Sequence, residues 1–212
     1  MSTLLLRLAG PMQSWGTDSK FDVRRTQREP SKSGVIGLIA AALGISRQDR
    51  DALLPLASMR FGVRVDQEGT MMRDFHTAHP EKGSSYVTHR YYLADAAFTV
   101  GLESEDEELL RKIGEALQVP AFPLYLGRRA CPPTGRIFLG ISPKNLEDAL
   151  LENAPDTASR LVRDAKEGER GGLVRDVPLS FDPARREYGF RRVVDYPLQA
   201  GAEHDPMAEL EG

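Results

Sequence analysis

The spacing of apolar residues over the first 142 positions restricts the chain to few folds. Apolar residues alternate with polar residues or glycine over 59–65 and again over 98–102. This period of two predicts strands with one buried face. Short apolar runs at 3–8 and 135–141, each beside Gly or Pro, predict two further strands.

Two main helices are predicted between these strands. The apolar residues of 33–43 recur at helical spacing, and Gly44 is suited to end that helix. Ser104 with Glu107 has the spacing of a capping box, and the helix that follows ends before Pro120. The order strand, helix, strand, strand, helix, strand predicts an α+β ferredoxin-like sandwich, the fold of RRM and RAMP domains. Many unrelated enzymes and carriers share this fold, so it does not by itself indicate a function.

The chain also contains an insertion and an extension. The stretch between the second and third strands predicts an inserted β-hairpin over about 73–92, and a further helix and strands are predicted after residue 142. We therefore expect a ferredoxin-like domain over 1–142 with this insertion. A C-terminal β-rich extension, with an acidic tail, is expected over 143–212.

The charge distribution bears on the partners of the chain. A net charge of −3 argues against a nucleic-acid-binding domain, because such domains are usually basic. However, residues 1–102 carry 13 basic and 10 acidic side chains, whereas residues 103–118 carry two and six. The acids are concentrated in one helix and in the tail, which leaves room for a basic surface elsewhere.

Composition also indicates the compartment. The single cysteine, Cys131, excludes an internal disulfide and fits a reducing environment. A membrane span needs about 20 consecutive apolar residues, and the chain has no such run. The start of the chain lacks a basic leader and a cleavage site. We expect a cytoplasmic protein that does not contact a membrane.

The first candidate segment is the loop after the first strand. It contains Gln13, Ser14 and the only tryptophan, Trp15. An indole in a polar loop can stack on a nucleic-acid base or insert into a partner protein. The same side chain could instead cover the edge of the hydrophobic core, and both interpretations stay open.

A basic segment leads into the first helix. Its candidate residues are Arg24, Arg25, Lys32, Ser33 and Gly34. Cations, a hydroxyl and free backbone N–H groups near the positive end of a helix dipole suit the binding of phosphate. The segment lacks the spacing of a Walker motif. A solvated run of charges is the alternative interpretation.

The hairpin and a later loop supply the remaining candidates. Those on the hairpin are Arg73, His76, His89, Arg90 and Tyr91. Those in the loop, between two proline breaks, are Tyr125, Gly127, Arg128 and Arg129. Arginine and aromatic side chains suit phosphates and unstacked bases, and histidines can also act as general acid and base. No HExxH motif, paired cysteine or carboxylate cluster supports a metal site.

Five blocks, taken together, resemble one family. They are residues 6–16, 30–34, 73–77, 96–100 and 125–132, which read LRLAGPMQSWG, PSKSG, RDFHT, AAFTV and YLGRRACP. These blocks resemble the CasD family, the RAMP-type subunits of type I-E CRISPR Cascade surveillance complexes. Beyond residue 142 the resemblance is thin, apart from residues 186–188.

The resemblance implies a noncatalytic subunit that needs no cofactor or metal. Its ferredoxin-like domain would bind the 5′ handle of the crRNA and join the large subunit of the complex to the backbone subunits. It would meet target DNA only indirectly, through the complex. The hairpin would act as a thumb that kinks the guide and leans on a backbone subunit, while residues 32–34 and 127–129 would line the path of the handle.

Two other functions stay open at this point. A sister family in type I-C systems cuts RNA with tyrosine, lysine and histidine side chains. The chain has His76, His89, Tyr91 and Lys82 in its insertion but lacks an adjacent Lys-His pair. A metal-independent endoribonuclease that processes CRISPR repeat RNA is therefore the alternative function. A protein adaptor anchored by Trp15 and the hairpin is a third interpretation.

Overall fold

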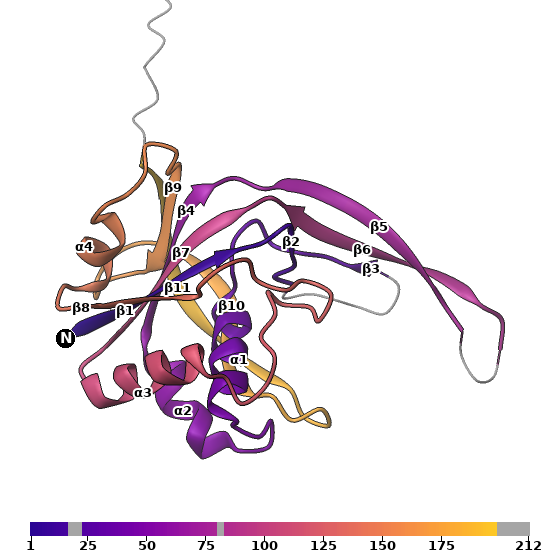
Figure 1. Ribbon diagram of the computed structural model, residues 1–212, viewed down its shortest axis with the longest axis horizontal. Coiled ribbons are helices and arrows are strands. Elements are labelled where there is room, and N and C mark those ends of the chain that lie inside the picture. Colours follow the sequence, from indigo (N-terminus) through magenta and orange to yellow (C-terminus); the bar gives the residue numbers. More distant parts are fainter. Residues whose placement is uncertain (17–22, 80–82, 199–212) are drawn as a thin grey trace, which may run out of the picture.

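A seven-stranded antiparallel sheet forms the centre of the fold (Figure 1). The computed structural model describes residues 1–16, 23–79 and 83–198. From one edge to the other the strands are β10 (Gly172–Ser180), β11 (Glu187–Pro197), β9 (Arg160–Asp164), β4 (Arg60–Gln67), β7 (Ala97–Ser104), β1 (Ser2–Ala9) and β8 (Phe138–Ser142). The predicted mixed α+β class is confirmed.

The four strands predicted within residues 1–142 lie next to one another in this sheet. β1 pairs with β7 on one side and with β8 on the other, and β7 also pairs with β4. α1 (Lys32–Leu43) and α2 (Arg50–Ser58) connect β1 to β4, and α3 (Glu107–Gln118) connects β7 to β8. This order of elements agrees with the prediction from the sequence.

The helix ends follow the sequence signals, with one shift. Gly44 ends α1 in the left-handed conformation, with φ 73°. The prediction that Ser104 caps α3 is wrong, because Asp106 accepts the N–H of Leu109 at 2.8 Å. The hydroxyl of Ser104 instead accepts the N–H of Asp106. Both residue types are good N-caps, and the aspartate also interacts favourably with the helix dipole.

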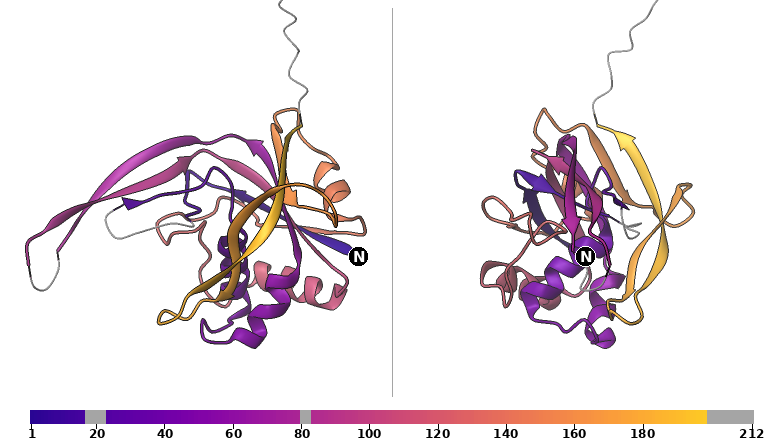
Figure 2. Two further views of the ribbon diagram at one scale, coloured as in Figure 1. Left: turned by 180° about the vertical axis from the view of Figure 1, so that it is seen from behind. Right: turned by 90° about the vertical axis from the view of Figure 1, so that its right-hand side faces the viewer.

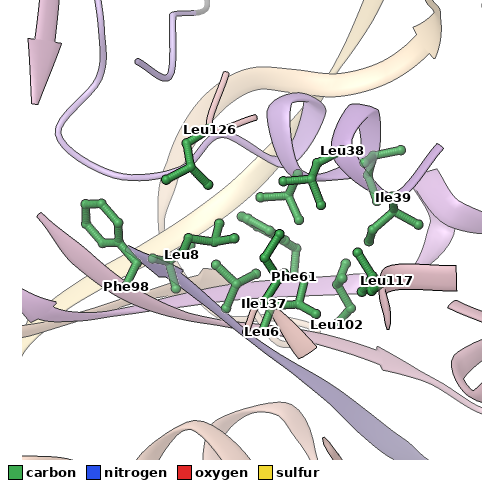
Figure 3. Close-up of a cluster of buried hydrophobic side chains, with 14 of the residues drawn as sticks. Leu6, Leu8, Leu38, Ile39, Phe61, Phe98, Leu102, Leu117, Leu126 and Ile137 are labelled. Atoms are coloured by element: carbon green, nitrogen blue, oxygen red, sulfur yellow. The ribbon is translucent and has the colours of Figure 1, made fainter. Parts of the chain in front are cut away.

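The main hydrophobic core lies between the sheet and α1, α2 and α3. Alternate residues of β1, among them Leu6 and Leu8, are fully buried there, as are Phe61 and Phe98. In Figure 3, Leu6 and Phe61 lie below Leu38 of α1, and Leu8 and Phe98 lie to one side, below Leu126. Burying side chains of this size contributes roughly 1.5–3 kcal/mol each, so this cluster fixes where α1 lies on the sheet. None of the described helices is both long and apolar enough to span a membrane.

The residues after 142 continue the same sheet. α4 (Leu146–Leu151) packs against β1, β4 and β7, where Leu146, Leu150 and Leu161 form a second, smaller core. β9 pairs with β4, β11 pairs with β9, and β10 forms the edge. β10 also packs against α1 and α2, so the C-terminal strands contact helices from the N-terminal half of the chain. The predicted acidic tail lies outside the described residues.

A long hairpin projects from the body of the protein. It consists of β5 (Thr70–Ala78) and β6 (Tyr86–Ala94), which pair in antiparallel register (Figures 1 and 2). Two short strands also pair with β6: β2 (Met12–Gln13) is antiparallel to it at the base of the hairpin, and β3 (Val23–Arg24) is parallel to it at its middle. The predicted inserted hairpin is therefore present, with wider bounds than 73–92.

Candidate functional site

A groove of about 560 Å³ lies at the N-terminal end of α1; we call it the α1 groove. Four segments far apart in the sequence form its walls: the loop after β2, β3, the loop over 123–131 and the turn between β10 and β11. The predicted site residues that line it are Ser14, Trp15, Arg24, Ser33, Gly34, Gly127 and Arg128. All three candidate segments outside the hairpin therefore meet at the groove.

The first turn of α1 forms the floor of the groove. Ser31 caps the helix, and its hydroxyl accepts the N–H of Gly34 at 3.3 Å. The N–H of Lys32 donates to the carboxylate of Asp176, 2.8 Å away. A helix N-terminus favours negative charge, but here a side chain of β10 already occupies part of it. Most of the positive charge of the groove therefore has to come from arginines.

Lys32 was predicted to contact RNA, but the structure buries its side chain away from the groove. Its residue is 4% exposed, and its Nζ donates to the carbonyl of Met59 at 2.6 Å. Burial lowers the pKa of Lys32, against the raising effect of the nearby Asp164 carboxylate. Lys32 therefore holds α1 against the sheet and presents no charge to the groove.

A buried charge cluster surrounds Lys32 and consists of Lys32, Asp164, Asp176 and Arg191. Arg191 donates to Asp176 through Nε at 2.6 Å and Nη2 at 3.0 Å, and to Asp164 through Nη1 at 2.8 Å. The two positive charges of the cluster are thus balanced by the two negative charges of its carboxylates. The cluster ties the C-terminal strands β9, β10 and β11 to the first residue of α1, so the extension fixes the floor of the groove.

Gln13 and Trp15 were also predicted to contact RNA, but the structure buries both side chains. Trp15 is 1% exposed and belongs to the main core, and its Nε1 donates to Oε1 of Gln13 at 3.0 Å. Gln13 is fully buried and donates to the carbonyls of Leu8 and Ala96. The indole therefore covers the edge of the core, the alternative interpretation of this loop.

The loop over 123–131 approaches the loop after β2 through its backbone. The N–H of Ser14 donates to the carbonyl of Leu126, and Gly127 has φ +83°. A Cβ at Gly127 would lie 1.7 Å from the carbonyl oxygen of Ser14, so only glycine fits. The hydroxyl of Ser14 donates to the carbonyl of Tyr91, so this serine lines the groove but is already bonded.

Arg128 joins the groove to the base of the hairpin. Its Nη2 donates to the carbonyl of Arg24 at 2.9 Å, and its guanidinium lies 4.8 Å from the ring centroid of Tyr92. Arg128 is half-buried, so part of its role is to position β3. Arg25 and Arg129 are exposed beside it. The mouth of the groove is consequently basic.

The predicted hairpin residues lie outside the groove. Nη2 of Arg73 lies 3.1 Å from Nδ1 of His89, and Nε2 of His76 lies 3.3 Å from a carboxylate oxygen of Asp74. The register pairs His89 with Phe75, the neighbour of His76. Successive residues of a strand point to opposite faces, so the two histidines lie on opposite faces of the hairpin.

The remaining hairpin candidates connect to the groove at one point. Arg90 is opposite Arg24 in the parallel pairing of β3 with β6, and Tyr91 is opposite Arg73. Because Arg24 lines the groove, the basic surface continues from the groove onto the hairpin. Within the described ranges, no group of three His, Cys, Asp or Glu side chains could hold a metal ion.

Besides Gly16 and Ser31, which adjoin predicted site residues, the sequence analysis missed three groove residues: Phe181, Arg186 and Tyr188. They come from the turn between β10 and β11 and the start of β11. Residues 186–188 were noted in the resemblance, but nothing in the local pattern indicated that this turn folds back onto α1. The packing of β10 on α1 brings it there.

A second cavity, of about 480 Å³, opens beside the groove; we call it the α1 recess. Tyr125, another predicted site residue, lines it together with Gly37 and Leu38 of α1. The recess and the groove share lining residues, among them Gly34 and Arg186, so they form one continuous depression.

Comparison with known proteins identifies the relatives of the chain. Residues 3–194 match the model of a family described as CRISPR-associated protein (Cas_Cas5). The "CRISPR system Cascade subunit CasD" of Escherichia coli (strain K12) is 37% identical over 174 residues, which cover 73% of this chain and 78% of that protein.

Solved structures agree with this match. One described as the crystal structure of a Cas protein is 40% identical, with a TM-score of 0.72, and the match covers 92% of this chain and 94% of that chain. A chain from a structure described as a CRISPR RNA-guided surveillance complex is 33% identical, with a TM-score of 0.75 and coverage of 92% and 89%.

Proposed function

The chain belongs to the Cas5 family of CRISPR-associated proteins, and on this basis we propose that it is a subunit of a Cascade surveillance complex that binds the 5′ handle of crRNA. The similarity to the E. coli Cascade subunit and to a chain of a surveillance complex supports the assembly. The observation that carries the RNA-binding role is the α1 groove, where basic and aromatic side chains from four segments converge. A cytoplasmic location remains a prediction from the sequence.

We infer that residues 1–142 form a ferredoxin-like domain of the RAMP type. The strand order β4-β7-β1-β8, with helical connections after β1 and β7, is the order expected for that fold. β1, one of its two central strands, leads through β2 into a loop that lines the groove. The assignment of residues 143–212 to an extension is retained as a description of the sequence, although its strands share the same sheet.

The arrangement suits a single-stranded RNA whose backbone follows the groove. Arg24 and Arg186 line it, with Arg25 and Arg129 exposed nearby, and these side chains suit phosphates. Phe181 and Tyr188 offer aromatic surfaces on which bases can stack. The net charge of −3 is compatible with this role, because acids are concentrated in residues 103–118 and 199–212.

We propose that the hairpin contacts a backbone subunit of the complex and that another surface contacts the large subunit. The hairpin projects from the body (Figure 2). It carries exposed Phe75, Tyr86 and Val87 towards its tip and exposed Met71 near its base. Exposed apolar side chains on a projecting hairpin are suited to contact a partner protein. Target DNA would be reached only through the assembled complex.

A noncatalytic role is favoured over repeat-RNA cleavage by the positions of the histidines. A general acid and a general base must both reach the scissile phosphate, yet His76 and His89 lie on opposite faces of the hairpin. Tyr91 shares a face with His89 only. We propose no cofactor and no metal for the handle-binding role.

The salt dependence of handle binding tests the groove. Each phosphate contact on a single strand contributes about 0.7 to the slope of log K against log salt concentration. The double variant Arg24→Ala/Arg186→Ala should therefore lower the slope by roughly 1.4 and weaken binding.

A matched control distinguishes groove contacts from total charge. Arg111→Ala/Lys112→Ala also removes two positive charges, but from the exposed face of α3. Its slope should equal that of the wild type. Equal slopes for the wild type and the groove variant would show that the handle does not lie in the groove.

A further inference from the structure

The α1 recess has the size and lining of a pocket for a small planar group. Its volume of about 480 Å³ falls within the range of about 300–1,000 Å³ that is common for small-molecule sites. Its walls are largely apolar, and the aromatic side chains among them are Phe122, Tyr125, Phe181 and Tyr188. Aromatic rings of this kind stack on planar ligands with little dependence on the identity of the ligand.

Two glycines of α1 border the recess, and only one of them is explained by packing. A Cβ at Gly34 would lie 2.9 Å from the ring of Trp15, so this glycine is needed for the indole to fit. A Cβ at Gly37 would meet only the ring of Phe181, at 3.7 Å, which is ordinary contact.

Gly37 therefore keeps space open. Alanine would fit there, and glycine within a helix costs about 0.8–1.0 kcal/mol relative to alanine. A larger side chain at position 37 would extend into the recess, because Gly37 lines it. The sequence thus accepts a less stable helix at the position whose side chain would fill this cavity.

We propose that the recess receives one nucleobase of the handle, turned out of the RNA strand, while the neighbouring phosphates lie in the α1 groove. This inference rests on the proposed function and names the part of the RNA that enters the second half of the depression. The shared lining by Gly34, Gly127 and Arg186 means that a strand in the groove passes the mouth of the recess.

The lining favours a base over a phosphate. Most of the wall is apolar or aromatic, which suits a planar base, and its charged residues are Arg47, Arg186 and Asp49, whose carboxylate would repel an anion. The hydroxyl of Ser46 and the guanidinium of Arg47 also line the cavity and can form hydrogen bonds with the edge of a base. Burial of a base among aromatic and apolar side chains, with polar groups at one end, is the common way in which proteins bind unstacked RNA bases.

The test uses the full chain and handle RNAs in which one nucleotide at a time is abasic. At one position, loss of the base should weaken wild-type binding by about 5- to 150-fold, the range that stacking on aromatic side chains provides. Gly37→Leu should weaken binding of the intact handle by a similar factor. With the RNA that is abasic at that position, Gly37→Leu and the wild type should bind equally, because both changes remove the same contact.

Two further variants keep the test decisive. Gly172→Leu is the matched control, since a Cβ at Gly172 meets no atom within 4 Å and this residue lines neither the recess nor the groove, so the same change of glycine to leucine should leave handle affinity unchanged. Tyr125→Leu removes a ring from the wall without adding volume, and it should weaken the intact handle but not the critical abasic RNA. This variant provides the answer if Gly37→Leu does not fold.

The outcomes separate this inference from the proposed function. Handle-dependent binding in which every abasic position has the same effect would overturn the recess inference alone. Normal handle affinity of Gly37→Leu, with loss of assembly into the complex, would assign the recess to a partner's side chain and also overturn it. Absence of handle-dependent binding by the wild type would overturn the proposed function and this inference together.

Discussion

Replacement of Asp176 by asparagine should destabilise the fold by about 3–5 kcal/mol, the usual cost of removing one partner from a buried ion pair. Asp176 is 1% exposed and accepts two hydrogen bonds from Arg191 and one from the N–H of Lys32. Asparagine has nearly the same shape but only one acceptor oxygen. Its amide would therefore place N–H groups against donors.

The magnitude follows from the charges that would remain. The wild-type cluster holds the two cations Lys32 and Arg191 with the two carboxylates Asp164 and Asp176. Asp176→Asn leaves two buried cations with one carboxylate. Arg191 also stacks over Phe61, 4.9 Å from its centroid, so it cannot turn into solvent without disturbing the core. The loss should thus exceed that of any exposed ion pair.

Urea denaturation measures this difference. With a dependence of about 1–3 kcal/mol per molar urea, the midpoint should fall by at least about 1 M. Asp195→Asn is the matched control: Asp195 is an exposed β11 residue that pairs with Arg160 at 2.7 Å, and its loss should cost less than about 1 kcal/mol. Because Lys32 begins α1, Asp176→Asn should also weaken handle binding. Equal midpoints for the two variants would refute the structural role assigned to the cluster.

Two further predictions concern the loop at the groove and the response to acid. Gly127→Ala should strongly lower the urea midpoint, because its Cβ would overlap the carbonyl of Ser14, whereas Gly172→Ala, with open space around it, should not; similar midpoints would contradict this account of the loop. Hydrogen bonds from Arg163 lower the pKa of Glu169 to about 2. The stabilisation from this carboxylate is therefore complete above its usual pKa of 4.5 and is lost as the pH falls towards 2. Glu169→Gln should make the urea midpoint less dependent on pH over this interval, and an unchanged dependence would show that the ion pair does not contribute.

The elements with local signals could be predicted from the sequence. The alternation over 59–65 needs only neighbouring residues, and it corresponds to β4. Gly44 likewise ends α1 as expected, because the left-handed conformation is intrinsically accessible to glycine. The hairpin also follows from its own residues, with two strand-forming flanks on either side of a polar link.

The errors at the site have a common cause in long-range contacts. The basic segment around Lys32 predicts a surface cation. Its burial depends on Asp164 and Asp176, which are far away in the sequence and lie in β9 and β10. Trp15 lies among polar neighbours in the sequence, yet Gln13 satisfies its N–H inside the core. Arg186 could not be placed at the groove before the packing of β10 on α1 was known.

The central claim, that the 5′ handle lies in the α1 groove, is tested most directly by photocrosslinking in the assembled complex. The guide would carry 4-thiouridine at single handle positions, and crosslinked peptides would be identified by mass spectrometry. We expect crosslinks in the segments that form the groove walls, namely residues 23–25, 127–129 and 181–188. Crosslinks confined to α4, on the opposite face of the sheet, with none in these segments, would contradict the account.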